Sequence, residues 1–312
     1  FFKNGETLLK NFNRLEVSGF GGLDATQLEH ITVGYTATDL IAPRYYAVFL
    51  NQSLHPALKD ASVREALAKT VDRDALITKI FNNHARAVYS PLLPEIEGAK
   101  NLENTTTTIE LAGQLLEKNG WILGDDGVRK KQFGKNSVRL EFDLTVPQLQ
   151  FLIETANILK ETWAHLGIKV NVIPVAPDDI TDANIRTRNY QMLLFGNILK
   201  HNPDVFAFWH SSERFFPGLN LSLYENKKVD TLLESIRKNF NIDARKKDIE
   251  KLQDFIVNDY PAVFLYSPNY LYVTTNKLKG FETTAIVTPA DRFDGIATWH
   301  FNTKRVFKPR TF

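Results

Sequence analysis

The sequence contains no cysteine among its 312 residues. Disulfides, thiolate metal sites and cysteine nucleophiles are therefore excluded, but the compartment stays open, because cysteine-free chains occur on both sides of a membrane. No apolar run approaches the roughly 18 residues that cross a bilayer, and residues 1–20 show no signal-peptide organisation. The chain also starts without an initiator methionine, so we expect it to be the interior of a longer protein.

The sequence has almost no excess of charge of one sign. Lys and Arg number 38 against 36 Asp and Glu, which gives a net charge of +2. Such a balance supplies no sustained field for a polyanion, so nucleic acid is not expected as a partner. Hydrophobic residues at 43% and charged residues at 24% are typical of an ordinary globular protein, and the length favours more than one lobe.

The common catalytic motifs are absent as well. The sequence has no G-x-S-x-G, no G-x-x-x-x-G-K-[ST], no H-E-x-x-H and no dinucleotide-binding glycine fingerprint. Of the seven histidines, His201 and His210 alone lie near one another in sequence, and the plainer interpretation is surface or hydrogen-bonded histidine rather than a metal pair. We expect no metal and no cofactor. A pair of acids that meets only in space would escape this search, so a hydrolase stays an alternative.

The first half of the chain alternates strand and helix patterns. Residues 45–51 form an apolar run of strand length, and helical patterns start near Asp60 and after Asp72, a good N-cap. A capping box at 107–110 opens a further helix that ends at Gly120. Asp125-Asp126-Gly127 indicates a tight turn rather than a calcium loop, because the other ligands of an EF-hand are missing.

The middle of the chain predicts a parallel crossover. Clean alternation over Val138–Val146 indicates a half-buried strand, a helical pattern follows over 152–166, and a second strand follows at 168–172. Strand, helix and strand with short connections favour a right-handed parallel unit and an α/β fold. The remaining expected elements are a helix at 178–188, a buried strand at 192–195, helices at 229–240 and, capped by Asp243, at 249–256, a strand at 262–266, and short strand pieces after 272 that return into another lobe.

An aromatic loop follows the buried strand that ends at Phe195. Residues 196–216 read GNILKHNPDVFAFWHSSERFF, and ligands of open α/β sheets bind in the crevice at the carboxyl ends of strands. The aromatic side chains offer rigid apolar surface there, and Asn202, Asp204, His210 and Ser211 offer polar tips. The alternative, which composition slightly favours, is that the aromatics pack the loop onto its own lobe.

Several separated segments together carry a family signature. Together they resemble the extracytoplasmic solute-binding proteins that serve peptide and nickel ABC transporters, in order and approximate spacing from about residue 45 to the end. The segments are Phe49-Leu50-Asn51, Asp60 to Leu67, Val71 to Ile77, Leu115 to Trp121 with Asp126 to Arg129, Pro203-Asp204 with Phe208 to Ser212, and Asn220 to Asp230.

The resemblance implies a periplasmic-binding-protein-like α/β lobe with a mixed, mainly parallel sheet flanked by helices, plus fragments of a second lobe. Residues 1–45 would be a fragment of the first lobe, 46–272 the second lobe, and 273–312 a return into the first. It also implies a cleft that closes on a peptide or similar small solute about a hinge, for delivery to a permease. We expect an extracytoplasmic, non-enzymatic monomer, held at the membrane, if at all, through an N-terminal region outside this sequence.

We predict ligand contacts from the aromatic loop and the segment after it. Well-studied peptide binders of this family carry an aspartate for the peptide's amino group four residues before the loop proline, where this chain has Leu199. The ligand therefore either lacks a free amino terminus or uses another acid, such as Asp204. The predicted ligand-binding residues are Asn197, Leu199, His201, Asp204, Phe208, Trp209, Asn220 and Tyr224.

Two residues of the signature, Arg64 and Asp72, are expected to stabilise the fold and not to contact the ligand. Arg64 stands beside Glu65 one turn into a helix, which favours a structural ion pair over a ligand clamp. Asp72 is expected to serve as an N-cap. Besides the transport receptor, two functions stay open: a ligand-sensing regulatory domain of the same fold, and the hydrolase mentioned above.

Overall fold

A computed structural model describes residues 2, 4–199 and 204–301. The chain divides into two compact units. The small unit comprises Phe1–Ala42, Phe81–Ala85 and Pro268–Phe312, and the large unit comprises Pro43–Ile80 and Arg86–Ser267. Within the described ranges, none of the helices combines the length and apolar composition that crossing a bilayer requires.

A mixed six-stranded sheet forms the centre of the large unit, in the order β4-β11-β3-β10-β8-β9. Strand β8 is parallel to both β9 and β10, whereas β3 is antiparallel to both β10 and β11. The predicted α/β class and mixed sheet are therefore confirmed, but the sheet is not mainly parallel, because two of these four pairings are antiparallel. The strands are β3 (Arg44–Leu50), β4 (Ala85–Ala87), β8 (Glu141–Pro147), β9 (Lys169–Val175), β10 (Met192–Ile198) and β11 (Ala262–Pro268).

The predicted strand–helix–strand unit is present as β8, α5 (Gln150–Ala164) and parallel β9. The alternating run Val138–Val146, however, is not one strand. Leu140 interrupts it, and its backbone N–H donates to the Arg129 carbonyl at 2.8 Å. The residues before Leu140 belong to a separate small sheet of β5 (Ile122–Leu123), β6 (Arg129–Phe133) and β7 (Asn136–Arg139).

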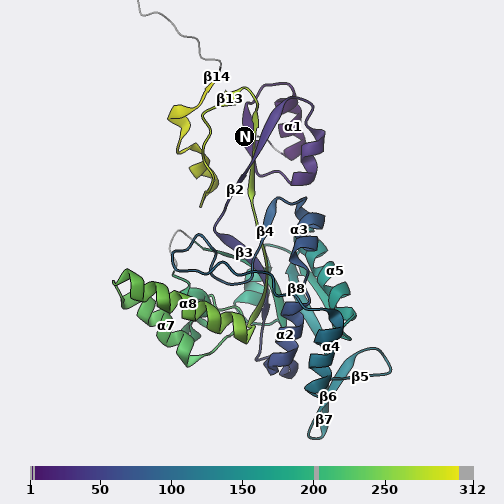
Figure 1. The fold of residues 1–312 in the computed structure, drawn as a ribbon. Coiled ribbons are helices and arrows are strands. Elements are labelled where there is room, and N and C mark those ends of the chain that lie inside the picture. The colour runs from purple at the N-terminus through teal and green to yellow at the C-terminus, as the bar shows by residue number, and fades with distance from the viewer. Residues whose placement is uncertain (1, 3, 200–203, 302–312) are drawn as a thin grey trace, which may run out of the picture. The chain divides into compact units, whose positions relative to one another are not determined.

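Helices cover both faces of the central sheet (Figure 1). Helices α7 and α8 pack together over a cluster that contains Tyr45, Phe49 and Phe264. On the opposite face, Trp163 of α5 donates its indole N–H to the Leu67 carbonyl of α2 at 3.1 Å. The helices of the large unit are α2 (Ala61–Lys69), α3 (Arg73–Phe81), α4 (Ile109–Lys118), α5, α6 (Phe206–Trp209), α7 (Lys227–Lys238) and α8 (Ile242–Asp259).

Helix caps agree with the sequence in part. The Asp72 carboxylate accepts from the Ala75 amide at 2.9 Å, as predicted. Helix α4 is capped by Thr108, one residue later than expected. Helix α8 is capped by Asn241, because its side chain, and not that of Asp243 in the first turn, accepts from the Ala244 amide. The helix expected at 178–188 is reduced to a π-helical turn, Thr181–Ile185.

The small unit has its own sheet, in the order β1-β12-β2, and its own core around Phe12, Phe20, Leu271 and Val273. Short strand pieces after residue 272 are present as predicted, but the sequence patterns did not indicate α1 or β2. The elements are α1 (Gly5–Asn13), β1 (Gly19–Gly21), β2 (Tyr35–Leu40), β12 (Tyr270–Thr275), and the pair β13 (Leu278–Lys279) with β14 (His300–Phe301).

Candidate functional site

A pocket of about 330 Å³ lies in the large unit at one edge of the central sheet. The parallel strands β8 and β10 end at this edge, and the antiparallel strand β3 begins there. This edge is where ligands of open α/β sheets bind. We call it the strand-end pocket, and its lining residues are Arg44, Tyr45, Tyr46, Pro147, Leu149, Leu152, Pro177, Ile180, Thr181, Phe195, Gly196, Asn197 and Ile198.

Tyr46 and Gly196 form the aromatic wall of the strand-end pocket. They are register partners across β3 and β10, and a Cβ atom on Gly196 would lie 2.8 Å from the Tyr46 ring. The same ring meets Phe151 edge-on at 5.3 Å and Tyr266 at 5.8 Å between centroids. Packing on three sides therefore fixes an aromatic surface beside the cavity.

A buried hydrogen bond supports the polar side of the pocket. The Asn197 amide donates to the Tyr45 hydroxyl at 2.9 Å, and both residues are buried. Burial raises the pKa of the Tyr45 phenol, and the side chains of Asn197 and Trp209 offset this only in part. Tyr45 therefore stays neutral and holds the Asn197 carboxamide in one orientation.

The lining of the strand-end pocket is mainly apolar, with Arg44 as its one charged member among the described residues. The Arg44 Nε atom is buried and has no hydrogen-bond acceptor in the described part of the chain. Burial raises the pKa of the neighbouring Tyr46 phenol, and the Arg44 charge opposes this rise. A few convergent polar groups in an apolar concavity are the usual composition of a small-molecule site.

Among the predicted ligand-binding residues, Asn197 lines the strand-end pocket, whereas the aromatic loop packs largely on its own unit. Leu199, Trp209 and Tyr224 belong to the core cluster under α7 and α8, and Phe208 packs against that cluster partly buried. Trp209 lies 6.2 Å from Tyr224, ring to ring, in an edge-on arrangement. The loop geometry thus agrees with the packing alternative. Ligand contact by these residues stays a prediction.

The polar members of the predicted set form bonds within the large unit. Asp204 accepts from the Phe206 amide and pairs with Arg237 at 2.7 Å. The Asn220 side chain is fully buried, donates to the Tyr224 carbonyl at 2.9 Å and accepts from the Tyr224 amide at 3.0 Å. These contacts brace turns within the large unit. His201 lies outside the described residues.

The structure gives no support to a metal centre in the described ranges. No cluster there brings three His, Asp or Glu side chains together in a way that could hold an ion. His210 instead stacks on Phe206 at 4.1 Å, and its ring accepts from the Ser212 amide at 3.1 Å. Its proposed partner His201 is not described, so the histidine pair stays untested.

Arg64 has a structural role, but not the expected one. Its side chain is buried and donates to the carbonyls of Leu58, at 2.9 Å, and Asp259, at 3.0 Å. Glu65 pairs with Lys69 at 2.7 Å, so the predicted ion pair between Arg64 and Glu65 is wrong. Adjacent helical residues point in different directions, and a salt bridge at spacing i,i+4 has the better geometry.

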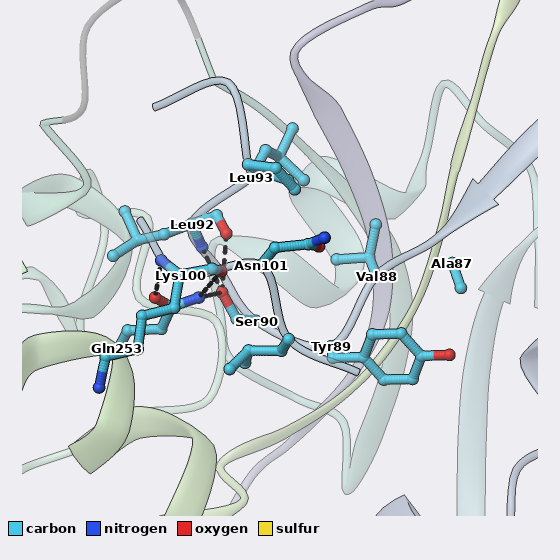
Figure 2. Close-up of a pocket in the computed structure, with 11 residues that line it drawn as sticks. Ala87, Val88, Tyr89, Ser90, Leu92, Leu93, Lys100, Asn101 and Gln253 are labelled. Atoms are coloured by element: carbon cyan, nitrogen blue, oxygen red, sulfur yellow. Dashed lines mark hydrogen bonds between the residues drawn. The ribbon is translucent and has the colours of Figure 1, made fainter. Parts of the chain in front are cut away.

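A second, much smaller pocket of about 30 Å³ lies beside Gln253 of α8 (Figure 2). The Gln253 side chain accepts from the Lys100 amide at 2.7 Å and donates to the Lys100 carbonyl and to Ser90, as the dashed lines in Figure 2 show. The polar groups of Gln253, Lys100 and Ser90 in this small pocket therefore bond to one another. The space that remains holds about one or two water molecules. We interpret it as an anchor for residues 90–101.

The sequence reasoning missed three of the residues that shape the strand-end pocket: Arg44, Tyr46 and Gly196. A signal for them existed in the segment RYYAVFLN, where a charged residue and two tyrosines open an apolar strand. Only the antiparallel pairing of β3 with β10 brings them to the same edge as the carboxyl ends of the parallel strands.

Comparisons with known proteins agree with this architecture. Residues 5–214 match the family model "Bacterial extracellular solute-binding proteins, family 5 Middle". The oligopeptide-binding protein AppA of Bacillus subtilis is 25% identical over 234 residues, which cover 72% of this chain and 41% of that protein. The nickel-binding protein NikA of Staphylococcus aureus is 24% identical over 231 residues, with 72% and 43% coverage. The chain thus spans less than half the length of these curated relatives.

Solved structures show the same fold. The crystal structure of NikZ from Campylobacter jejuni, in complex with Ni(L-His), superposes with a TM-score of 0.77 at 20% identity, covering 95% of this chain and 60% of that one. AppA from Bacillus subtilis, in complex with a nonapeptide, gives 0.76 at 21% identity, with 97% and 59% coverage. By the family match over two thirds of its length, the chain belongs to the bacterial extracellular solute-binding proteins of family 5.

Proposed function

We propose that this chain is the solute-binding part of an ABC importer, which captures a peptide or similar small solute and delivers it to a membrane permease. The observation that carries the proposal is the strand-end pocket, an apolar cavity with oriented polar groups at the carboxyl ends of β8 and β10. A rigid aromatic wall and a few fixed hydrogen-bonding groups suit reversible binding better than bond cleavage. We therefore infer that the chain is not an enzyme.

The proposed solute class is supported by the relatives, whose names specify oligopeptides and nickel. The second lobe, residues 46–272, would contain most of the large unit, and the two remaining segments, 1–45 and 273–312, would be parts of the first lobe. This division is supported by unit boundaries that fall after Ala42 and Ser267, although Phe81–Ala85 also groups with the small unit. We further propose that the protein acts outside the cytoplasm as a monomer.

Leu199 affects how the amino terminus of a peptide could be bound. Its side chain is buried in the core cluster, and its amide donates to the Pro43 carbonyl at 2.7 Å. A buried leucine offers no charge to an α-ammonium group, so the proposed solute is held without that contact or by another acid.

Isothermal titration of the protein tests the proposal. The panel contains di- to pentapeptides with free and blocked termini, nickel–histidine, and neutral small solutes. We expect saturable binding of at least one member, with no product formed on prolonged incubation. A flat titration for the whole panel contradicts solute capture, and product release from a peptide or glycoside substrate would favour the hydrolase instead.

A further inference from the structure

Arg44 is a cation at the strand-end pocket for which the described part of the chain supplies no partner. No carboxylate there lies within ion-pair distance of it, and no hydrogen bond from its side chain is formed. Two other arginines also have a buried, unbonded Nε, but each binds through its terminal nitrogens, Arg86 to Glu95 and Arg292 to the Pro289 carbonyl. Arg44 differs from both because no atom of its guanidinium has an acceptor among the described residues.

A buried donor without an acceptor is unfavourable, because the group has lost its water without gaining a partner. The Arg44 Nε is in this position, while the rest of the side chain is only half-buried and reaches the pocket. A guanidinium presents its donors in a fixed fork that matches the two oxygens of a carboxylate. The missing acceptor is therefore most simply a carboxylate brought by the solute.

The other residues that line the pocket suit a solute with one carboxylate and an apolar side chain. None of the described residues that line the pocket is acidic, so nothing in it competes for the Arg44 charge. The same pocket is also lined by Tyr46 and by the apolar side chains of Leu152 and Phe195. A volume of about 330 Å³ is at the small end for ligand pockets, which suits one end group with its side chain better than a whole peptide.

We propose that the strand-end pocket binds a carboxylate on the Arg44 guanidinium, with an apolar or aromatic side chain of the same solute against Tyr46. This inference rests on the proposed function and names the solute class at its site. The carboxylate comes either from the C-terminus of a peptide or from a free small acid.

The test compares three probes by isothermal titration of the full chain: N-acetyl-Ala-Ala-Phe, its C-terminal amide, and 3-phenylpropionate. Arg44→Gln removes the charge, and Arg139→Gln is the matched control, because Arg139 lies on β7 and pairs with Asp126, away from the pocket. The free acid should bind about tenfold to one hundredfold tighter than the amide, since a charge-assisted hydrogen bond is lost with the carboxylate. Arg44→Gln should abolish this difference, and Arg139→Gln should preserve it.

The relative affinities of the acetylated peptide and of 3-phenylpropionate distinguish the two carboxylate sources. Tighter binding of the acetylated peptide identifies a peptide C-terminus, and tighter binding of 3-phenylpropionate identifies a free small acid. Equal affinity for acid and amide, an unchanged preference in Arg44→Gln, or no binding of either carboxylate overturns the inference. If the carboxylate inference fails in one of these ways but neutral or amidated members of the wider panel still bind, the proposed function of solute capture stands. A flat titration for every solute overturns both the carboxylate inference and the proposed function. Thermal melting without ligand verifies that Arg44→Gln folds, as expected for a side chain that forms no hydrogen bond with the described part of the chain.

Discussion

Gly196 and Tyr46 face each other across β10 and β3, so close that a methyl group on Gly196 would lie 2.8 Å from the tyrosine ring. Real side chains essentially never approach to that distance without a shift. The glycine is therefore what allows the ring to lie against β10 and to form a flat wall of the strand-end pocket. Because Phe151 and Tyr266 hold the ring from other sides, it has little freedom to move away.

Gly196→Ala should weaken solute binding at this pocket by about tenfold, because displacing a packed ring costs on the order of 1–3 kcal/mol, and ~1.4 kcal/mol corresponds to a factor of ten. Titration with the tightest solute of the panel measures it. Gly295→Ala is the control, since the nearest atom to its new methyl group would be 3.8 Å away. Unchanged affinity in Gly196→Ala would mean that the ring does not contact the solute.

A feature of this fold could be predicted from the sequence when the residues that determine it lie close together in the chain. The β8–α5–β9 unit and the Asp72 cap depend on neighbours within one or two elements, and periodicity captures both. The break at Leu140 depends on a bond to Arg129, eleven positions away, and no alternation pattern reveals it.

The candidate site was harder to predict, because its residues lie far apart in the chain. Arg44 and Asn197 lie about 150 positions apart in the chain and meet only because β3 pairs with β10. The aromatic loop was conspicuous in sequence because of its composition, yet composition cannot distinguish a ring that packs under α7, as Trp209 does, from one that faces a ligand. The pocket residues were less conspicuous because each is ordinary by itself.

The hydrogen bond between Asn197 and Tyr45 should contribute measurably to stability. Tyr45→Phe removes the acceptor and leaves the buried Asn197 amide without it, which should lower the free energy of unfolding by about 1–3 kcal/mol. Urea denaturation measures this difference. Tyr46→Phe is the matched control, because the Tyr46 hydroxyl forms no hydrogen bond within the described ranges and its loss should change stability by less than about 0.5 kcal/mol. Equal losses in the two variants would contradict the assignment.

Gln253 should matter for folding and not for solute capture. Gln253→Leu leaves the Lys100 amide and carbonyl without their partner, and we expect a loss of at least about 2 kcal/mol in the free energy of unfolding. Solute affinity should stay within about twofold at temperatures where the variant is folded. Gln132→Leu, at an exposed position, serves as the control and should be near neutral. A selective loss of binding in Gln253→Leu would instead make the small pocket of Figure 2 part of the site.

Asp60 should give stability a dependence on acid pH. Burial alone would raise the pKa of its carboxyl, but hydrogen bonds from Lys131, Ser62 and Trp121 together lower the pKa below its ordinary value of 3.8. The unfolded chain therefore takes up the proton first as the pH falls. The contribution of Asp60 is complete above pH 3.8 and is lost as the pH falls through the lower, folded-state value.

Asp60→Asn keeps an oxygen that can cap α2 but removes the charge that attracts Lys131, at 2.9 Å. The variant should be less stable than the original chain by up to about 1 kcal/mol near neutral pH, since a partly exposed ion pair contributes no more. The difference should shrink as the pH is lowered below 3.8, and urea denaturation of both proteins across that range measures it. Other carboxyls with lowered pKa values titrate in both proteins, so they cancel in the difference. A gap that stays constant down to the acid limit of folding would show that the Asp60 charge is not what stabilises the contact.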